Sequence, residues 1–153
     1  MNKKGIIYIL IIILIMLVAI IGVMGYFHNH IKVGDAYFTL PEGYKCVANG
    51  EYTNITNDNN EYIILDYNNT NDLKKVINDY VKYNEDHNLS LSLYNITIGE
   101  YTVYKSIMNN DTQIVHYWFI YNDQTYQIYT RSANSNSEKI ISDLISSVKT
   151  API

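Results

Sequence analysis

The chain has 153 residues, a length that suffices for one domain and one short additional segment. Its formal net charge is −4. All 15 acidic residues but only nine of the 11 Lys and Arg follow residue 30, so the region from residue 31 onward carries 9 − 15 = −6. A domain this acidic is not expected to bind nucleic acid or to dock on anionic lipid headgroups.

Residues 6–27 form an uncharged, strongly apolar segment directly after Lys3, Lys4 and Gly5. A helix of this length covers about 33 Å, compared with about 30 Å of bilayer hydrocarbon. The positive-inside rule places residues 1–5 in the cytoplasm and the rest of the chain outside. The sequence therefore predicts a single-pass helix at residues 6–27 that anchors the chain in the cell membrane.

The alternatives to a membrane anchor for this segment are a cleaved signal peptide, a lipoprotein signal and a prepilin leader. A cleaved signal peptide has a shorter apolar core and a small-x-small cleavage site, which "GVMGYFHNH" lacks. A lipoprotein has a Cys just after the apolar run, and Cys46 is too distant. "KKGII" resembles the start of a type IV prepilin cleaved after Gly5, but Leu10 occupies the position of that family's usual Glu. A pilin-like subunit remains the structural alternative.

After a polar stem at residues 28–34, apolar and polar residues alternate over short segments. Strands are predicted in "AYFTLPEGY", which ends at Pro41 and Gly43, in "YKCVA" and in "YIILDY". The intervening "NGEYTNITNDNNE" is expected to form a polar loop or a weak hairpin. "YIILDY" is apolar on both faces, which is typical of a strand that is covered on both sides.

Two segments have helical periodicity instead. The first is expected to be capped by Asn71, and its apolar stripe consists of Leu73, Val76, Ile77, Tyr80 and Val81. The second is expected to begin at a capping box of Ser135 and Glu138, and its stripe consists of Ile140, Ile141, Leu144, Ile145 and Val148. These helices could cover the two faces of a sheet.

Strands are also predicted between the two helices. "LSLSLYNITI" and "YTVYKSIM" alternate around a turn at Gly99 and Glu100, and "NNDT" at residues 109–112 forms the next turn. Residues 114–130 contain six aromatic rings and predict a β-hairpin that turns at Asn122 and Asp123. Trp118 and Phe119 are adjacent and must face opposite ways. We therefore expect core packing here and not a flat stacking platform.

Together the elements predict an α+β fold. The order of "FTLPEGY" at residues 38–44, the striped helix, the hairpin "YWFIYNDQTYQIYTRS" and the closing "ISDLISSV" resembles the PsbP-like domain family in its membrane-anchored prokaryotic form. The resemblance covers roughly residues 31–150 and implies an α/β/α sandwich with a central antiparallel sheet at residues 35–153. Plant members assist photosystem II and help retain its ions, but this chain shows no matching set of ligand positions.

No catalytic, cofactor-binding or metal-binding residues are predicted. The chain has no Gly-rich phosphate loop, no Cys pair and no His-x-x-x-His. Weak candidates are each explained better as structural or solvated groups: the His28 and His30 pair, a calcium-like loop at residues 57–61, Asp66, and the only cysteine, Cys46, with His87 or His116. Five Asn-x-Ser/Thr sequons begin at Asn54, Asn68, Asn88, Asn95 and Asn110, with Asn95 the weakest because it lies inside a strand pattern.

The sequence thus favours a membrane-anchored, extracytoplasmic binding or accessory domain without catalytic activity. Its expected partners are other envelope or membrane proteins, and no cofactor is expected. The alternatives are a type IV pilin-like structural subunit and an extracytoplasmic enzyme.

Overall fold

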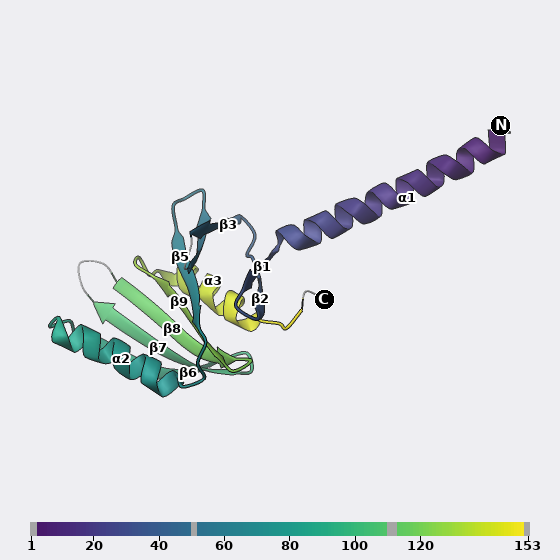
Figure 1. Cartoon of the computed structure of the whole chain (residues 1–153). Helices are drawn as coiled ribbons and strands as arrows, with labels where there is room; N and C mark the ends of the chain where they lie inside the picture. The colour runs from purple at the N-terminus through teal and green to yellow at the C-terminus, as the bar shows by residue number, and fades with distance from the viewer. Residues whose placement is uncertain (1–2, 50–51, 110–112, 152–153) are drawn as a thin grey trace.

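The computed structural model describes residues 3–49, 52–109 and 113–151 of the chain (Figure 1). Within these ranges there are three helices, α1 (Lys3–His28), α2 (Leu73–Asp86) and α3 (Ser135–Ser146). The strands of the same ranges are β1 (His30–Val33), β2 (Ala36–Thr39), β3 (Tyr44–Asn49), β4 (Tyr52–Asn57), β5 (Tyr62–Asn68), β6 (Leu91–Ile98), β7 (Tyr101–Asn109), β8 (Gln113–Tyr121) and β9 (Gln124–Thr130).

A seven-stranded sheet in the order β3-β4-β5-β9-β8-β7-β6 forms the centre of the described chain. Every neighbouring pair in it is antiparallel. Five of the six neighbouring pairs are consecutive strands of the chain, but the pairing of β5 with β9 brings residues 64–68 against residues 125–129. The structure therefore confirms the predicted α+β class and the central antiparallel sheet.

The two faces of the sheet have different covers. Val115, Tyr117 and Phe119 of β8 point into the main core, together with Ile141, Leu144 and Ile145 of α3. The alternate residues of β8 point the other way, where the Tyr80 ring of α2 lies 4.7 Å from His116 and 4.9 Å from Trp118. Because successive side chains of a strand alternate in direction, α2 and α3 lie against opposite faces.

A small hairpin completes the core on the α3 side. β1 pairs with β2, and Ile31, Val33, Ala36 and Phe38 all point inward and are buried. The chain end closes over it, because Tyr37 and Lys149 exchange both backbone hydrogen bonds at 2.9 and 3.0 Å. Residues 30–33, which the sequence suggested were part of a polar stem, thus form a strand of the folded domain.

Residues 52–57 form β4, which pairs antiparallel with β3 and with β5, so the expectation of a loop is wrong and the alternative of a hairpin is confirmed. The segment is polar by composition, but Ile55 is fully buried and Asn54 is 5% exposed. Pairing with β3 on one side and β5 on the other satisfies its backbone groups. Tertiary pairing therefore overrides a weak local pattern.

Both predicted helix caps are displaced by one residue. Asp72, not Asn71, caps α2 by accepting the Lys75 backbone N–H at 3.0 Å, while Asn71 Nδ2 donates to Asp123 at 3.2 Å. For α3 the capping box is formed by Asn134 and Ser137 and not by Ser135 and Glu138. Glu138 instead pairs with Lys105 at 2.8 Å.

The predicted hairpin turn at Asn122 and Asp123 is confirmed. Tyr121 pairs with Gln124 across it, and the two turn residues have φ values of 46° and 59°. This is the left-handed pair of a two-residue hairpin turn, which Asn and Asp tolerate better than other non-glycine residues. The turn predicted at residues 109–112 lies mostly outside the described residues.

None of the helices within the described residues is long and apolar enough to cross a membrane. The transmembrane span predicted over residues 6–27 is therefore not supported.

Gly34, between β1 and β2, has a left-handed φ of 57° and no room for a side chain. An added Cβ would lie 2.5 Å from Gln124 Oε1 and 2.8 Å from Tyr67 Cδ2. That Gln124 oxygen also accepts the Asp35 backbone N–H at 3.0 Å, which fixes the hairpin on the sheet. We expect Gly34→Ala to lower the free energy of unfolding by about 1–3 kcal/mol, measured by urea denaturation.

Gly43→Ala is the matched control for this prediction. Gly43 has a φ of 81°, but no described atom lies within 4 Å of its added Cβ. Gly43→Ala therefore introduces the backbone strain of an L-residue at positive φ without the steric overlap. Equal losses of stability in the two variants would contradict the close packing of the hairpin at Gly34.

Candidate functional site

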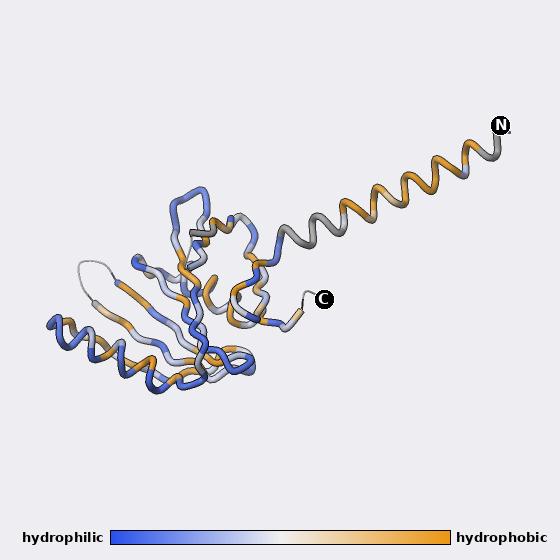
Figure 2. Tube along the Cα trace, in the orientation of Figure 1, coloured by the Kyte–Doolittle hydropathy of each residue, from blue (hydrophilic) through white to orange (hydrophobic). Residues whose placement is uncertain are grey.

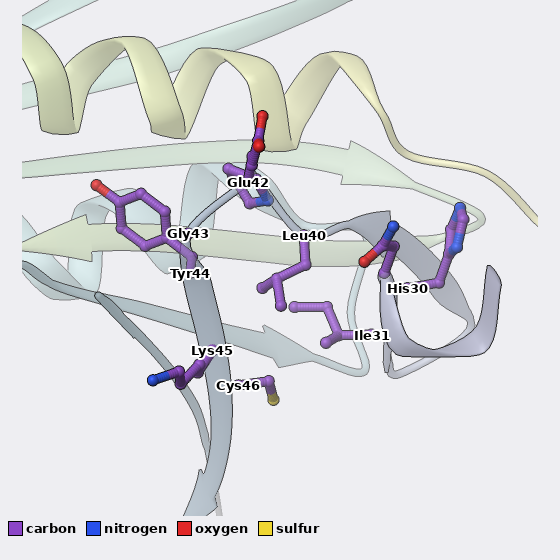
Figure 3. Close-up of a pocket in the computed structure, with 10 residues that line it drawn as sticks. His30, Ile31, Leu40, Glu42, Gly43, Tyr44, Lys45 and Cys46 are labelled. Atoms are coloured by element: carbon purple, nitrogen blue, oxygen red, sulfur yellow. The ribbon is translucent and has the colours of Figure 1, made fainter. Parts of the chain in front are cut away.

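A hollow of about 800 Å³ lies where α1 enters the folded domain (Figure 3). We call it the β3 groove. Figure 3 shows Ile31 and Leu40 in its middle, with His30 on one side and Lys45 on the other. Its lining is Asn29, His30, Ile31, Leu40, Pro41, Glu42, Gly43, Tyr44, Lys45 and Cys46.

Local turn chemistry brings these segments together. The Leu40 N–H donates to the Asn29 carbonyl at 2.7 Å, which ties the end of β2 to the residue before β1. The chain then turns through Pro41 and Gly43, and the Tyr44 N–H donates back to the Pro41 carbonyl at 3.1 Å. Pro with its fixed φ and Gly with a positive φ are the residues such a turn favours. The turn directs β3 along one wall of the groove.

A hydrogen-bonded carboxylate fixes the side of the groove nearest α3. Glu61 Oε2 accepts from the Tyr44 hydroxyl, from Asn57 Nδ2 at 2.7 Å and from Asn136 Nδ2 at 2.8 Å. The hydrogen bonds from Tyr44 and Asn136 hold the pKa of Glu61 below its usual range. Burial, with Glu61 alongside, raises the pKa of Tyr44 to about 12. Glu61 is thus a charged structural tie between β3, the β4–β5 turn and α3.

Cys46 lines the groove and is exposed as a residue. Partial burial of the sulfur raises its pKa, so the protonated thiol prevails at neutral pH. His116 lies on β8, on the opposite face, with β4, β5 and β9 between the two strands. Four strand spacings separate them by roughly 19 Å. His87 follows the end of α2. The structure therefore does not bring Cys46 and His116 together.

The metal-like patterns of the sequence form no donor cluster. Among the described residues, no group of three or more His, Cys, Asp or Glu side chains is placed to hold a metal ion. His30 lines the groove, and the side chain of His28 lies outside the described residues. In the turn at residues 57–61, Asn57 Oδ1 accepts the backbone N–H groups of Asn59 and Glu61, both at 3.0 Å. This oxygen closes the turn.

A second polar cluster lies beneath α2, around Trp118 and His116. Trp118 is fully buried, as predicted, and the His116 ring stacks on Tyr129 with centroids 4.4 Å apart. Burial, with a smaller contribution from Arg131, lowers the pKa of His116 to about 4. Among the described residues, Trp118 Nε1 and His116 Nδ1 are buried without a hydrogen-bond partner. The alternation in the sequence predicted that both rings lie on one face of the strand. It did not indicate that these two ring nitrogens lack hydrogen-bond partners.

Beside this cluster is a small cavity of about 100 Å³. Asp66 lines it and accepts from Gln127 Nε2 at 2.8 Å and from the Tyr67 backbone N–H at 2.7 Å. Trp118, Thr125 and Gln127 also contribute to its walls. Asp66 is thus hydrogen-bonded within the sheet.

The solvent accessibility of the Asn-x-Ser/Thr sequons differs from what their sequence pattern indicated. Asn54 is buried, whereas Asn68, Asn88 and Asn95 are exposed. Asn95 was the weakest candidate by pattern, but its strand β6 lies at the edge of the sheet, where a strand residue stays accessible. Asn110 lies outside the described residues.

Comparisons with known proteins find similarity in fold and not in sequence. No protein-family model and no curated protein matches the chain. A crystal structure from Bacteroides thetaiotaomicron has a TM-score of 0.54 at 14% identity; the match covers 79% of this chain and 47% of that one, so this chain spans about half the length of that protein. The solution structure of cyanobacterial PsbP from Synechocystis gives a TM-score of 0.48 at 13% identity, over 75% and 86% of the two chains. The chain is structurally similar to cyanobacterial PsbP at low sequence identity.

Proposed function

We propose that this chain is a non-catalytic accessory or binding domain, held at the outer face of the cell membrane through α1, that recognises other envelope proteins. The observation that carries the proposal is the exposed apolar surface of α1. Every large apolar side chain from Ile6 to Ile21 is exposed, with values between 41% at Ile6 and 66% at Tyr8. Figure 2 shows these apolar residues along the helix where it extends away from the folded domain.

Such a surface is unfavourable in water. Contiguous apolar patches beyond a few hundred Å² are rare on soluble monomers and mark contacts with lipid or with another protein. Residues 6–27 carry no charge, while Lys3 and Lys4 precede them. Lipid acyl chains would cover this apolar surface and hold the chain at the membrane. As part of this proposal, the acidic domain lies on the outer side, where a membrane-impermeant reagent reaches it without lysis.

The β3 groove supports a binding role. Its lining begins at Asn29, one residue after the end of α1, so attachment through α1 would hold the groove close to the membrane surface. Apolar Ile31 and Leu40 lie beside charged Glu42 and Lys45, a mixture typical of protein-recognition surfaces. The nearby Glu61 carboxylate is engaged in structural hydrogen bonds. Binding therefore fits this groove better than proton transfer or nucleophilic attack.

Cys46 allows a direct test, because it is the only cysteine and it lines the groove. Protoplasts of cells that express the chain are treated with a membrane-impermeant, photoreactive maleimide and then irradiated. We expect labelling of Cys46 without lysis, followed by cross-linking to a defined envelope protein. Labelling should be faster at about pH 8.5 than at neutral pH, because the raised pKa keeps the thiol protonated at neutral pH.

Two variants control this experiment. Cys46→Ser should remain unlabelled. Cys46→Ser combined with Tyr83→Cys moves the probe to an exposed position on α2, and it should be labelled without capturing the same protein. Labelling only after lysis would refute the proposed location, and equal capture from both positions would refute recognition by the groove. A purified protein that begins at Ile6 would favour the pilin-like alternative.

A further inference from the structure

The free edge of β6 is unprotected, in contrast to the other edge of the sheet. β6 is the last strand in the order, and its eight residues, Leu91 to Ile98, include no charge and no proline. Leu93 and Tyr94, which point to opposite faces, are 42% and 48% exposed. At the other edge, β3 carries the exposed Lys45. Proteins commonly protect edge strands with charges, and an apolar, uncharged edge readily pairs with another strand.

Hollows lie beside the middle of β6 on both faces of the sheet. On the α2 side a hollow of about 390 Å³ is lined by Leu93 and Tyr104 of the sheet and by Lys74, Ile77 and Asn78 of α2. On the α3 side a hollow of about 340 Å³ is lined by Tyr94, Asn95, Ile96, Lys105 and Ile107. α3 packs against the Ile98 end of β6, but the exposed side chains of Leu93 and Tyr94 in the middle of the strand lack a cover within the described chain.

The N-cap Asp72 complements the dipole of α2, but the charges of the first and last turns run against it. The first turn contains Lys74 and Lys75 and no acid, and the last turn contains Glu85 and Asp86 and no base. A helix favours the opposite arrangement, by about 0.3–1 kcal/mol for each charge. Lys74 and Glu85 are 11 residues apart, which places them within about 20° of each other on the helix. Because Lys74 lines the hollow over Leu93, both charges lie on the side of α2 nearest β6.

From these features we infer that β6 is a homodimer interface, at which the same strand of a second copy pairs antiparallel with it. The two-fold axis lies perpendicular to the sheet, so directly opposed residues share a face and the sheet continues from one copy into the next. The two α2 helices then run antiparallel on one face, with the basic end of each beside the acidic end of the other.

This charge pattern is why a second copy fits the edge. The two domains are both acidic, and contact through an uncharged strand brings the fewest like charges together. The reversed charges of α2, unfavourable within one copy, become complementary across the two-fold axis. Pairing also covers Leu93 and Tyr94 and satisfies the backbone groups of the free edge.

The test measures self-association of the full chain in detergent, in a Cys46→Ser background that excludes disulfide-linked dimers. We expect a dimer by sedimentation velocity. Leu93→Lys places a charge in the strand and should raise the dimer dissociation constant on the order of 100-fold. Tyr94→Lys should do the same from the other face. Val47→Lys, at an exposed position of the β3 edge, should leave the dimer intact.

The charges of α2 provide an independent arm. Lys74→Glu and Glu85→Lys should each weaken the dimer by about tenfold, and the double variant should recover most of the loss. Circular dichroism melts show whether each variant is folded. A monomer at every concentration would overturn the inference. This result would also be obtained if β6 paired with a strand of another protein and not with a second copy. So would a dimer that tolerates Leu93→Lys and Tyr94→Lys, because association would then run through α1 or another surface.

Discussion

Trp118→Ala is expected to lower the free energy of unfolding by about 3–5 kcal/mol. The indole is fully buried between β8 and α2, and the Tyr80 ring meets it edge-on at 4.9 Å. Truncation leaves a cavity that the rigid sheet cannot fill, and a domain of this size has only about 5–15 kcal/mol of stability in total. Urea unfolding monitored by circular dichroism measures the loss. The variant should melt at a much lower temperature or fail to fold.

Ile120→Ala is the control, because Ile120 points to the same face of β8 but is 39% exposed. It should cost much less than Trp118→Ala. Trp118 is the only tryptophan, so the wild-type emission reports this site alone. We expect blue-shifted fluorescence and weak quenching by acrylamide. Red-shifted emission with easy quenching would show that the ring is exposed and that α2 does not cover it.

Acidification from neutral pH should destabilise the domain through His116. Burial lowers the pKa of its imidazole from 6.5 to about 4 in the folded chain, so the unfolded chain binds the proton first. The stability that the neutral ring contributes is fully present above the unfolded pKa and is lost as pH falls from about 6.5 towards 4. A shift of this size corresponds to about 3 kcal/mol when the loss is complete.

Urea unfolding at several pH values between about 7.5 and 5 measures this loss, above the range in which carboxylates dominate. His116→Phe keeps an aromatic ring beside Tyr80 and Tyr129 but cannot accept a proton, so its stability should change much less over this interval. His87→Gln alters an exposed histidine at the end of α2 and should retain the wild-type pH dependence. Identical pH profiles for wild type and His116→Phe would contradict the burial of a neutral imidazole.

Residue pattern alone predicted most of the elements and the packing of the central hairpin. Alternation over residues 114–121 implied a strand with two apolar faces, and the structure buries Trp118 on one face and Phe119 on the other. The spacing of Leu144 and Ile145 within a helical stripe correctly indicated the face that α3 turns to the core. These features are readable because the direction of a side chain in a strand or helix depends only on its own few neighbours.

Such local patterns could not predict the candidate site. The β3 groove combines residues before β1, in the β2–β3 turn and in β3, and Glu61 reaches it through Tyr44 and Asn136, 17 and 75 residues away in sequence. No local signal marks a carboxylate that will receive three donors from separate elements. The cap of α2 was predicted one residue away, at Asn71, whose amide nitrogen instead donates to Asp123 in a turn distant in sequence.

Composition and local periodicity determined the acidic charge, the uncharged apolar segment, the α+β class and the existence of most strands and helices. The tertiary structure alone decided the strand order, and with it the pairing of β5 with β9 and the place of β6 at an open edge. That order buries Asn54 and exposes Asn95, the reverse of their local patterns. The physical reason is that a strand's pattern specifies which faces it buries, whereas its neighbours depend on long-range hydrogen bonding that residues far apart in the chain settle together.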